Sequence, residues 1–440
     1  MDKNYIFNVL SDWNFWKNTP DTGNTRSGYL KRMESLLDTR HVIVVTGVRR
    51  AGKSYLMRQM INNLIEKGVE RRNTLFVNFE DPRLPRADAS LLEEIYGIYR
   101  THMKPSKIPY LFLDEVQEVV GWEKWVRMMH ELGKARIVVS GSNARLLSGE
   151  LASVLTGRHV DVVVFPLSFE EFISFKKFSI ENTNKDEREI VLRQLLNEYL
   201  EHGGFPEVVL RPQQRTEIVR AYLEDIQEKD IAQRYRIRKT EQIRELARYY
   251  FTNPGRPVTF TGLEKHFRIS ADTIEKFTSY FENSYVFFML KRFSYKVKEQ
   301  GKSPRKVYAI DNALANFAGF KFSSDSGFGM ENLVFLHLKR HQAINPGVEL
   351  YYWKDTHGRE VDFVVKQGLE IRFLIQVCYR TDDIYTLKRE LRALQKAMEE
   401  LRTKKAIVIT GDNREGKEKL PCGTVSYVPV QEWLLNKESV

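Results

Sequence analysis

The stretch HVIVVTGVRRAGKSYLMRQ, residues 41–59, places a strand, a glycine-containing turn and a helix in one short run. Its β-branched residues 42–45 predict a buried strand, and Leu56, Met57 and Met60 give the segment that follows a helical spacing. Between the two lies the pattern GxxxxGKS, and a position between a strand and a helix identifies this pattern as a phosphate-binding loop. The alternative, a solvated basic turn, would not require flanking elements of these kinds.

Each part of this loop has an expected role in binding ATP. Gly47 and Gly52 allow the backbone N–H groups to turn inward and form a cradle for an anion. Lys53 is expected to reach the β- and γ-phosphates, and the Ser54 hydroxyl is expected to bind Mg²⁺. Together with Arg50, these residues form the predicted nucleotide site.

The composition is that of a folded protein with two or three domains. The chain has 440 residues, of which 42% are hydrophobic and 29% are charged. No apolar run approaches the roughly 18 residues that cross a bilayer, and the first residues lack the pattern of a signal peptide. We therefore expect a cytoplasmic protein without a membrane partner. Cys378 and Cys422 form no CxxC pair, so no disulfide scaffold or cysteine zinc site is indicated.

The positive charge of the chain is concentrated in one region. The formal net charge is +11, and residues 231–310 contain 17 Lys or Arg against 7 Asp or Glu. A basic region on an otherwise balanced chain indicates a polyanionic partner, and nucleic acid is the leading candidate.

Acidic side chains follow two further predicted strands. The apolar residues 110–113 lead directly into Asp114 and Glu115, about 60 residues after the phosphate loop. We expect Asp114 to contribute to the Mg²⁺ site and Glu115 to polarise the attacking water. Glu80 follows the apolar strand at residues 74–79, and it either orients a water or γ-phosphate or caps the next helix.

Polar residues also follow the strand predicted at residues 135–140. Asn143 or Ser142 could hold the water or the γ-phosphate, although an ordinary turn would select the same residue types. Arg158 precedes another predicted strand, residues 160–164, and is our candidate for an arginine finger acting on a neighbouring subunit, with Arg145 second. The competing interpretation of Arg158 is a surface salt bridge.

Several motifs in this order carry a family resemblance. They are GVRRAGKS, LFLDE, GSN, TGRH followed by FPLSFEEF (residues 165–172), and HGGFPEVV (residues 202–209). The chain resembles the AAA+-type P-loop ATPases of archaea and bacteria that carry a C-terminal restriction-endonuclease-like domain of unknown function. The resemblance implies an α/β protein that forms an oligomer, expected to be a hexameric ring. It also implies an ATPase core at 1–165, a helical lid at 166–230, a winged-helix-like module at 231–325 and a nuclease-like α/β domain at 326–440.

The pattern of the middle module supports a winged-helix order. Helices are predicted at residues 241–251, 261–267 and 271–283, followed by strands at 285–292 and 306–310. A basic wing between the two strands supplies the predicted DNA contacts, which are Lys296, Lys298, Lys302, Arg305 and Lys306. Cations on a wing predict contacts with the DNA backbone, duplex or branched, with little sequence preference, although winged helices also dock proteins.

The C-terminal domain keeps only part of a nuclease site. Glu331 and Asp362 occupy the positions of a helix acid and a strand acid, but the expected acid-x-Lys of the third strand reads Gln376-Val377-Cys378. The loss of one carboxylate weakens a metal site, and the loss of the lysine removes the partner of the attacking hydroxide. Arg380 is a poor substitute because an arginine does not readily give up its proton. We expect a fold kept for structure, assembly or DNA contact.

The leading hypothesis is an ATP-hydrolysing, oligomeric DNA-binding motor or remodeller that uses ATP and Mg²⁺. One alternative is a nucleotide-dependent switch that assembles with other proteins without moving DNA. The other is an ATP-dependent nuclease, which would require Asp362 for Mg²⁺-dependent cleavage.

Overall fold

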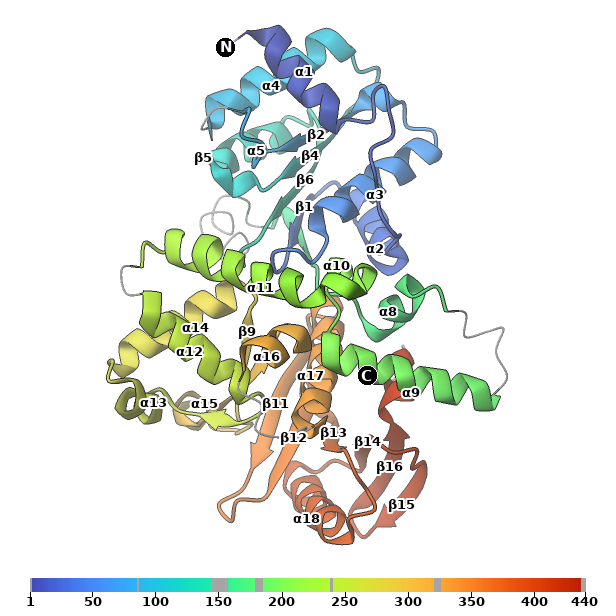
Figure 1. Ribbon diagram of the computed structural model, residues 1–440, viewed down its shortest axis with the longest axis vertical. Coiled ribbons are helices and arrows are strands. Elements are labelled where there is room, and N and C mark those ends of the chain that lie inside the picture. The colour runs from blue at the N-terminus through green and yellow to red at the C-terminus, as the bar shows by residue number, and fades with distance from the viewer. Residues whose placement is uncertain are drawn as a thin grey trace. The chain divides into compact units, whose positions relative to one another are not determined.

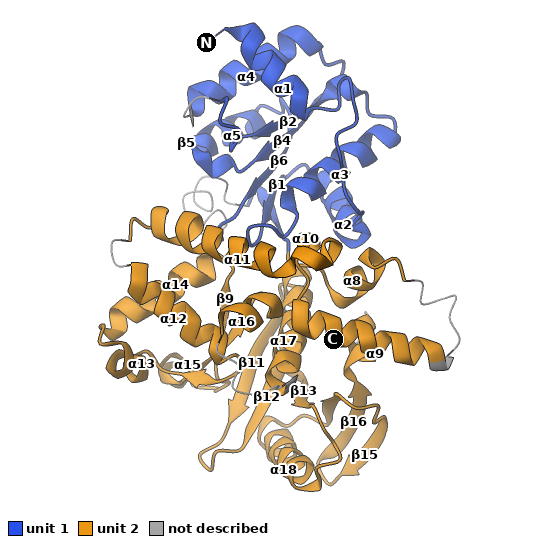
Figure 2. Ribbon diagram, in the orientation of Figure 1, with its two compact units in different colours: residues 1–164 blue, residues 165–440 orange. Residues whose placement is uncertain are grey.

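The structure is a computed structural model (Figure 1) that describes residues 2–84, 87–144, 155, 157–178, 185–237, 240–319 and 326–436. The chain divides into two compact units, Met1–Val164 and Phe165–Val440 (Figure 2). None of the described helices combines the length and the apolar character needed to cross a bilayer.

Unit 1 is built on a parallel sheet, and in the described residues its strands lie in the order β2-β4-β6-β1-β7. The strands are β1 (Val42–Thr46), β2 (Thr74–Asn78), β4 (Tyr110–Asp114), β6 (Arg136–Gly141) and β7 (His159–Val163). Helices cover both faces, so the strands are almost continuously apolar, and every residue of β1 is buried. This arrangement confirms the predicted α/β fold.

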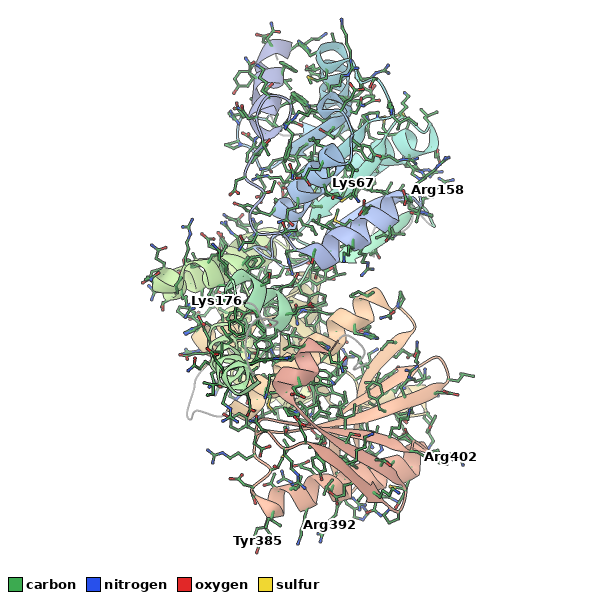
Figure 3. All side chains as sticks on the ribbon, turned by 90° about the vertical axis from the view of Figure 1, so that its right-hand side faces the viewer. Lys67, Arg158, Lys176, Tyr385, Arg392 and Arg402 are labelled. Carbon is green, nitrogen blue, oxygen red and sulfur yellow. The ribbon has the colours of Figure 1, made fainter. Side chains whose placement is uncertain are left out.

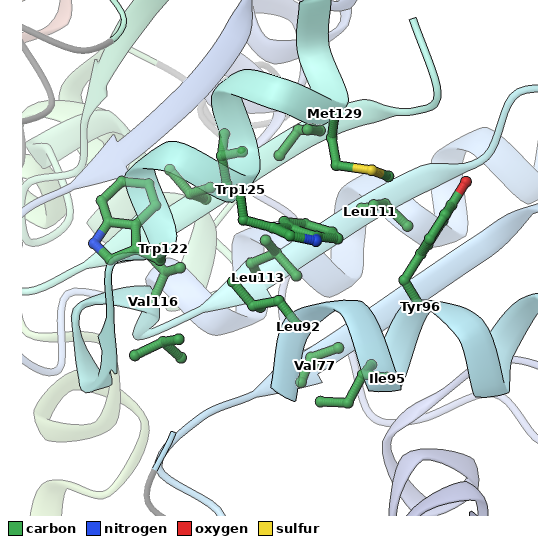
Figure 4. Packing of buried hydrophobic residues seen from close by; sticks show 14 of the residues in the cluster. Val77, Leu92, Ile95, Tyr96, Leu111, Leu113, Val116, Trp122, Trp125 and Met129 are labelled. Carbon is green, nitrogen blue, oxygen red and sulfur yellow. The ribbon is translucent and has the colours of Figure 1, made fainter. Parts of the chain in front are cut away.

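The helices of unit 1 bury their apolar faces against this sheet (Figure 1). They are α1 (Lys3–Trp13), α2 (Ser27–Leu37), α3 (Lys53–Glu66), α4 (Ala89–Met103) and α5 (Trp122–Glu131). In α5, Trp122, Trp125, Val126 and Met129 are buried and follow the helical period. Figure 4 shows Trp125 and Met129 in the same cluster as Leu111 of β4. Short elements complete the unit: β3 (Ala87–Asp88), β5 (Val119–Val120), η1 (Arg71–Asn73) and η2 (Val116–Glu118).

The strand order brings the phosphate loop, Asp114, Glu115 and Asn143 to the carboxyl ends of neighbouring strands. The phosphate loop leaves the carboxyl end of β1, Asp114 ends β4, and residues 142–143 follow β6, which lies between those two strands. In open α/β sheets, ligands bind outside the carboxyl ends of the strands.

Unit 2 begins with helices. They are α8 (Phe169–Phe175), α9 (Lys185–His202), α10 (Pro206–Leu210), α11 (Arg215–Asp225) and a π-helix (Ile226–Gln233), with η3 at Pro212–Gln214. A capping box at Ser168 and Glu171 starts α8. The Gly203-Gly204 turn is shaped by close packing, because a Cβ at Gly203 would lie 1.8 Å from Asp311 Oδ1, and the Gly204 N–H donates to Asp311 Oδ2 at 2.7 Å. These contacts hold the turn in one shape.

The next elements follow the helix, strand, helix, helix, strand, strand order of a winged-helix-like module. They are α12 (Thr240–Thr252), β8 (Pro257–Val258), α13 (Phe260–Phe267), α14 (Ala271–Asn283), β9 (Phe287–Leu290) and β10 (Arg305–Ala309). The antiparallel sheet has the order β8-β10-β9. The segment between β9 and β10, which was predicted as the basic wing, contains the short helix α15 (Val297–Lys302).

The C-terminal part of unit 2 is a mixed α/β domain with the sheet order β11-β12-β13-β14-β16-β15 in the described residues. Its strands are β11 (Val348–Lys354), β12 (Glu360–Gln367), β13 (Glu370–Cys378), β14 (Lys405–Thr410), β15 (Gly416–Leu420) and β16 (Gly423–Pro429). Its helices are α17 (Ser326–Ile344), α18 (Ile384–Leu401) and α19 (Val430–Leu435). The short helix α16 (Asn312–Ala318) follows β10 and packs mainly against α9, α11 and α12. The amphipathic helix α18 buries Leu394 and Met398 in the core beside β12 and β13.

Candidate nucleotide site and basic wing

The phosphate loop has a backbone that only its glycines can supply. Gly47 and Gly52 have φ values of 144° and 97°, and a Cβ on Gly47 would lie 2.1 Å from the carbonyl oxygen of Val164. Arg50 also has a positive φ, 68°, and its side chain is exposed. The sharp turn directs the chain from β1 into α3, whose first residue is Lys53. The loop therefore has the shape that a phosphate cradle requires.

Lys53 lies folded back over this loop. Its Nζ donates to the carbonyl oxygens of Gly47 at 3.1 Å and Val48 at 3.2 Å, and it lies 3.9 Å from Glu115 Oε1. The side chain is 4% exposed, so the charge is held at the loop and away from bulk water. A buried cation at the first residue of a helix is suited to phosphate binding.

Asp114 is the buried carboxylate of the site. It accepts hydrogen bonds from the hydroxyls of Ser54 and Ser140. Burial, and then the negative charge of Glu115, raise the pKa of Asp114 to about 6, against the opposing effects of both serines and Lys53. A hydroxyl and a carboxylate that already touch are a donor set that fits Mg²⁺, which takes few protein ligands alongside phosphate oxygens and water.

Glu115 is positioned by strain and by hydrogen bonds. Its φ of 51° lies in the left-handed region, which non-glycine residues adopt only at a cost in backbone energy. Its N–H donates to Ser140 Oγ at 3.2 Å, and Gln117 donates to one of its carboxylate oxygens. The carboxylate therefore stands next to Lys53 and Asp114, where a water attacking the γ-phosphate would need a base.

The remaining predicted residues of unit 1 lie in different places. Asn143 and Ser142 are buried at the carboxyl end of β6, on the same edge as the phosphate loop. Glu80 pairs with Arg49 of that loop at 3.0 Å, and its side chain is 42% exposed. Arg145 lies outside the described residues.

Arg158 lies near the amino ends of the strands, at the opposite end of the sheet from the phosphate loop. It precedes β7, which runs parallel to β1 with His159 beside Val42, so Arg158 belongs to the amino ends of the strands. The five residues of β1 span about 17 Å, which separates Arg158 from the phosphate loop of its own chain. It forms an ion pair with Glu131 and lies at the surface of unit 1 (Figure 3). The ion pair matches the salt-bridge interpretation, and the role as a finger for a neighbouring subunit stays a prediction.

The sequence interpretation missed two features of the site. Ser140 joins Asp114 to the backbone of Glu115, but a serine within a strand has no recognisable pattern. Arg26 donates to the Ala51 carbonyl oxygen at 3.0 Å, and Gln59 of α3 donates to two backbone carbonyls of residues 22–24 at 2.8 Å. These contacts hold the N-terminal segment against the phosphate loop across 25 or more residues of chain, which no local motif could reveal.

Asp114→Asn should stabilise the nucleotide-free protein at pH 8. Folding raises the pKa of the Asp114 carboxyl group from 3.8 to about 6. Above pH 6 the ionised carboxylate therefore destabilises the folded state. This effect becomes smaller as the pH falls below 6 and is lost below about pH 4, where the group is protonated in both the folded and the unfolded state. The expected gain is on the order of 1–3 kcal/mol at pH 8 and smaller at pH 5. Thermal unfolding at both pH values measures it. The same variant should lose the stabilisation that Mg²⁺ and ATP give the native chain, and an equal gain at both pH values would contradict the prediction.

The basic wing, residues 296–305, exposes part of its predicted DNA surface. Lys296, Lys298 and Lys302 are exposed, and Lys296 pairs with Glu299 at 3.1 Å. Arg305 is half-buried, with its guanidinium 5.1 Å from the Phe260 ring.

The prediction that Lys306 contacts DNA is wrong. Its side chain is 2% exposed and lies among Glu331, Glu360 and Asp362 of the C-terminal domain. The sequence interpretation assigned it by its charge and its place beside the wing, but the pleat of β10 turns it inward.

The fold and the site define a P-loop ATPase of the AAA+ type. A family model described as an AAA domain matches residues 39–173, and two described as domains of unknown function, DUF8612 and DUF4143, match residues 193–326 and 326–433. The chain is 34% identical over 404 residues to the uncharacterized protein MJ1544 of Methanocaldococcus jannaschii, covering 89% of this chain and 88% of that protein. The chain belongs to this family of P-loop ATPases with an N-terminal AAA domain and a C-terminal DUF4143 domain.

Other similarities are weaker. An uncharacterized protein of Haemophilus influenzae is 29% identical over 426 residues, covering 93% of this chain and 98% of that protein. Among solved structures, the ORC1 protein of Aeropyrum pernix in complex with DNA has a TM-score of 0.32 at 14% identity, covering 69% of this chain and 93% of that one. DnaA of Aquifex aeolicus bound to AMPPCP has a TM-score of 0.27 at 17% identity, covering 62% and 91%.

Proposed function

We propose that this protein hydrolyses ATP with Mg²⁺ and uses the cycle to move or remodel DNA held by its basic wing. The observation that carries the hydrolytic part is the meeting of Lys53, Ser54, Asp114 and Glu115 at one edge of the sheet. Such a set provides a phosphate ligand, two metal ligands and a base at the carboxyl ends of neighbouring strands.

The roles of these side chains follow from their positions. Lys53 would release the loop carbonyls and bind the β- and γ-phosphates, while Ser54 and Asp114 would hold Mg²⁺. When bound, the metal ion neutralises charge on the phosphates. Glu115 would accept the proton of the attacking water, and Asn143 would orient that water or the γ-phosphate.

The DNA part of the proposal rests on the wing. Tyr295, which precedes it, and Val297 are 73% and 80% exposed among Lys296, Lys298 and Lys302. An exposed aromatic ring among cations is suited to a nucleic acid, since cations contact phosphates and rings stack on bases. The exposed residues of α14 are Asp272, Glu275 and Lys276, so this face is net acidic, which favours backbone contacts through the wing over base reading by that helix.

The proposal extends to an oligomer, with a hexameric ring as its expected form. Arg158 lies away from its own phosphate loop, and in a ring a neighbour's Arg158 would approach the γ-phosphate once its pair with Glu131 opened.

Replacing Lys296, Lys298 and Lys302 with alanine tests the DNA role. A gel-shift series with duplex and branched DNA should show affinity about 10- to 100-fold lower near 0.1 M salt, and a salt slope smaller by about 3. Stimulation of ATP turnover by DNA should fall in parallel, while basal turnover remains. A matched variant with alanine at the exposed residues Lys404, Lys405 and Lys417 should behave like the native chain.

The same experiment addresses the competing function, a nucleotide-dependent switch that assembles with proteins. ATP turnover unaffected by DNA, together with DNA binding that is equal in both variants, would overturn the motor and favour the switch.

A further inference from the structure

Lys306 places a buried ammonium group at the centre of an acidic cluster. Its Nζ lies 2.8 Å from Glu360 Oε1, 3.0 Å from Glu331 Oε1 and 3.0 Å from Asp362 Oδ1. The Tyr308 hydroxyl donates to Glu331 Oε1 at 2.7 Å. An ammonium has three N–H donors, and here three carboxylates accept them, so the cation is fully satisfied.

The negative charges around Lys306 favour its protonated, positively charged form. Burial alone would lower the pKa of Lys306, but the negative charges around it, that of Glu331 foremost, outweigh burial and raise this pKa well above its usual value. The acidic neighbours therefore favour the charged form of this lysine. Removing it would leave three carboxylates without their counter-ion.

The cluster joins two parts of unit 2. Lys306 and Tyr308 lie two residues apart on β10 of the winged-helix-like module, so both side chains leave the same face of that strand. Glu331 comes from α17, and Glu360 and Asp362 come from β12 of the C-terminal domain. Asn332 reinforces the junction by exchanging two hydrogen bonds with the backbone of Ala309, at 2.9 and 3.0 Å.

The cluster does not fit the metal ion that a nuclease-like domain implies. The carboxylate oxygens surround a nitrogen at hydrogen-bonding distance, whereas Mg²⁺ requires oxygens at about 2.1 Å. On the third strand, Gln376 uses its amide on Glu390 at 2.7 Å and on the Asp362 N–H at 3.3 Å. Among the residues that the structure describes, no group of three or more Asp, Glu, His or Cys is arranged to hold a metal ion. Arg380, the considered substitute for the missing lysine, is exposed.

We infer that Lys306 is a resident cation that takes the place of a divalent metal ion in the nuclease-like domain. It excludes the metal from Glu331, Glu360 and Asp362 and, by the same contacts, fastens β10 to α17 and β12. The domain then serves as the support of the winged-helix-like module, without cleaving DNA. This inference does not depend on ATP hydrolysis.

Mn²⁺ binding to the nucleotide-free full-length chain tests the exchange of lysine for metal. By calorimetry and electron paramagnetic resonance, Lys306→Ala should gain one Mn²⁺ site per chain that is at least about 10-fold tighter than any Mn²⁺ binding by the native chain. Adding Asp362→Asn should abolish the new site. Lys354→Ala is the matched control: Lys354 contacts Glu360 at 2.9 Å but is 38% exposed, and its loss should add no site.

The outcomes are distinct even if Lys306→Ala folds poorly. Should it melt early, the addition of Mn²⁺ should raise its melting temperature, and absence of that rise would overturn the inference. A folded Lys306→Ala or Lys306→Met variant that binds no more Mn²⁺ than the native chain would also overturn it. So would Mn²⁺-dependent DNA cleavage by the native chain that Asp362→Asn removes, since Lys306 would then be part of a working nuclease site.

Discussion

Glu115→Gln should reduce ATP turnover by about 10²- to 10³-fold while ATP binding persists. Glutamine keeps the size of the side chain and can still contact Gln117, but it cannot accept a proton from water. Glu115 is 7% exposed and held at a φ of 51°, so the replacement should keep its position. Steady-state turnover and the affinity for a fluorescent ATP analogue, measured on the same preparation, separate hydrolysis from binding.

Lys53→Ala should instead weaken ATP binding itself, and ATP turnover should fall because the nucleotide is no longer held. The Lys53 side chain is 4% exposed and its ammonium contacts the loop itself, so its removal takes away the main positive charge at the phosphates.

Glu80→Gln is the matched control for Glu115→Gln, because Glu80 is a carboxylate that is 42% exposed and paired with Arg49. If Glu80→Gln, rather than Glu115→Gln, abolished turnover, the base would have to be reassigned to Glu80.

The nucleotide site could be predicted because its residues are set by local chain geometry. Gly47, Lys53 and Ser54 lie within eight residues, and a strand that ends in Asp114 and Glu115 delivers them to the same edge of a parallel sheet. Ser140 and Arg26 could not be found in this way. They act through partners 25 or 26 residues distant, and only the folded chain shows that proximity.

Lys306 shows why charge in a sequence does not establish a surface. Lys302 and Lys306 lie four residues apart in the same basic run, yet the first is exposed and the second is buried. The difference comes from β10, where Lys306 pairs with Leu290 and its side chain faces the C-terminal domain. The sequence already showed that the third strand of the nuclease-like domain lacks a lysine and that Lys306 lies at the start of a predicted strand. The sequence did not show that these two features are connected, because Lys306 contacts Asp362, which lies 56 residues further along the chain.

Gly47→Ala should destabilise unit 1 by about 3–5 kcal/mol and abolish ATP binding. Its φ of 144° excludes a side chain, and the added Cβ would lie 2.1 Å from the carbonyl oxygen of Val164. That segment cannot easily move aside, because the Val164 N–H donates to the Thr46 carbonyl at 2.7 Å and closes β7 against β1. Hydrogen exchange of residues 42–46 and 159–163, followed by mass spectrometry, reads the stability of unit 1 separately from unit 2.

A matched substitution separates the close contact from the effect of backbone strain alone. Gly121 also has a positive φ, 76°, but a Cβ there would meet no atom within 4 Å, so Gly121→Ala should cost only about 1–2 kcal/mol. It should leave ATP binding intact, since it changes the start of α5 and not the loop. If the two variants exchanged hydrogen equally and bound ATP equally, the packing of Gly47 against Val164 would not be what shapes the phosphate cradle. The position of Lys53 would then have to be explained by its own hydrogen bonds to Gly47 and Val48.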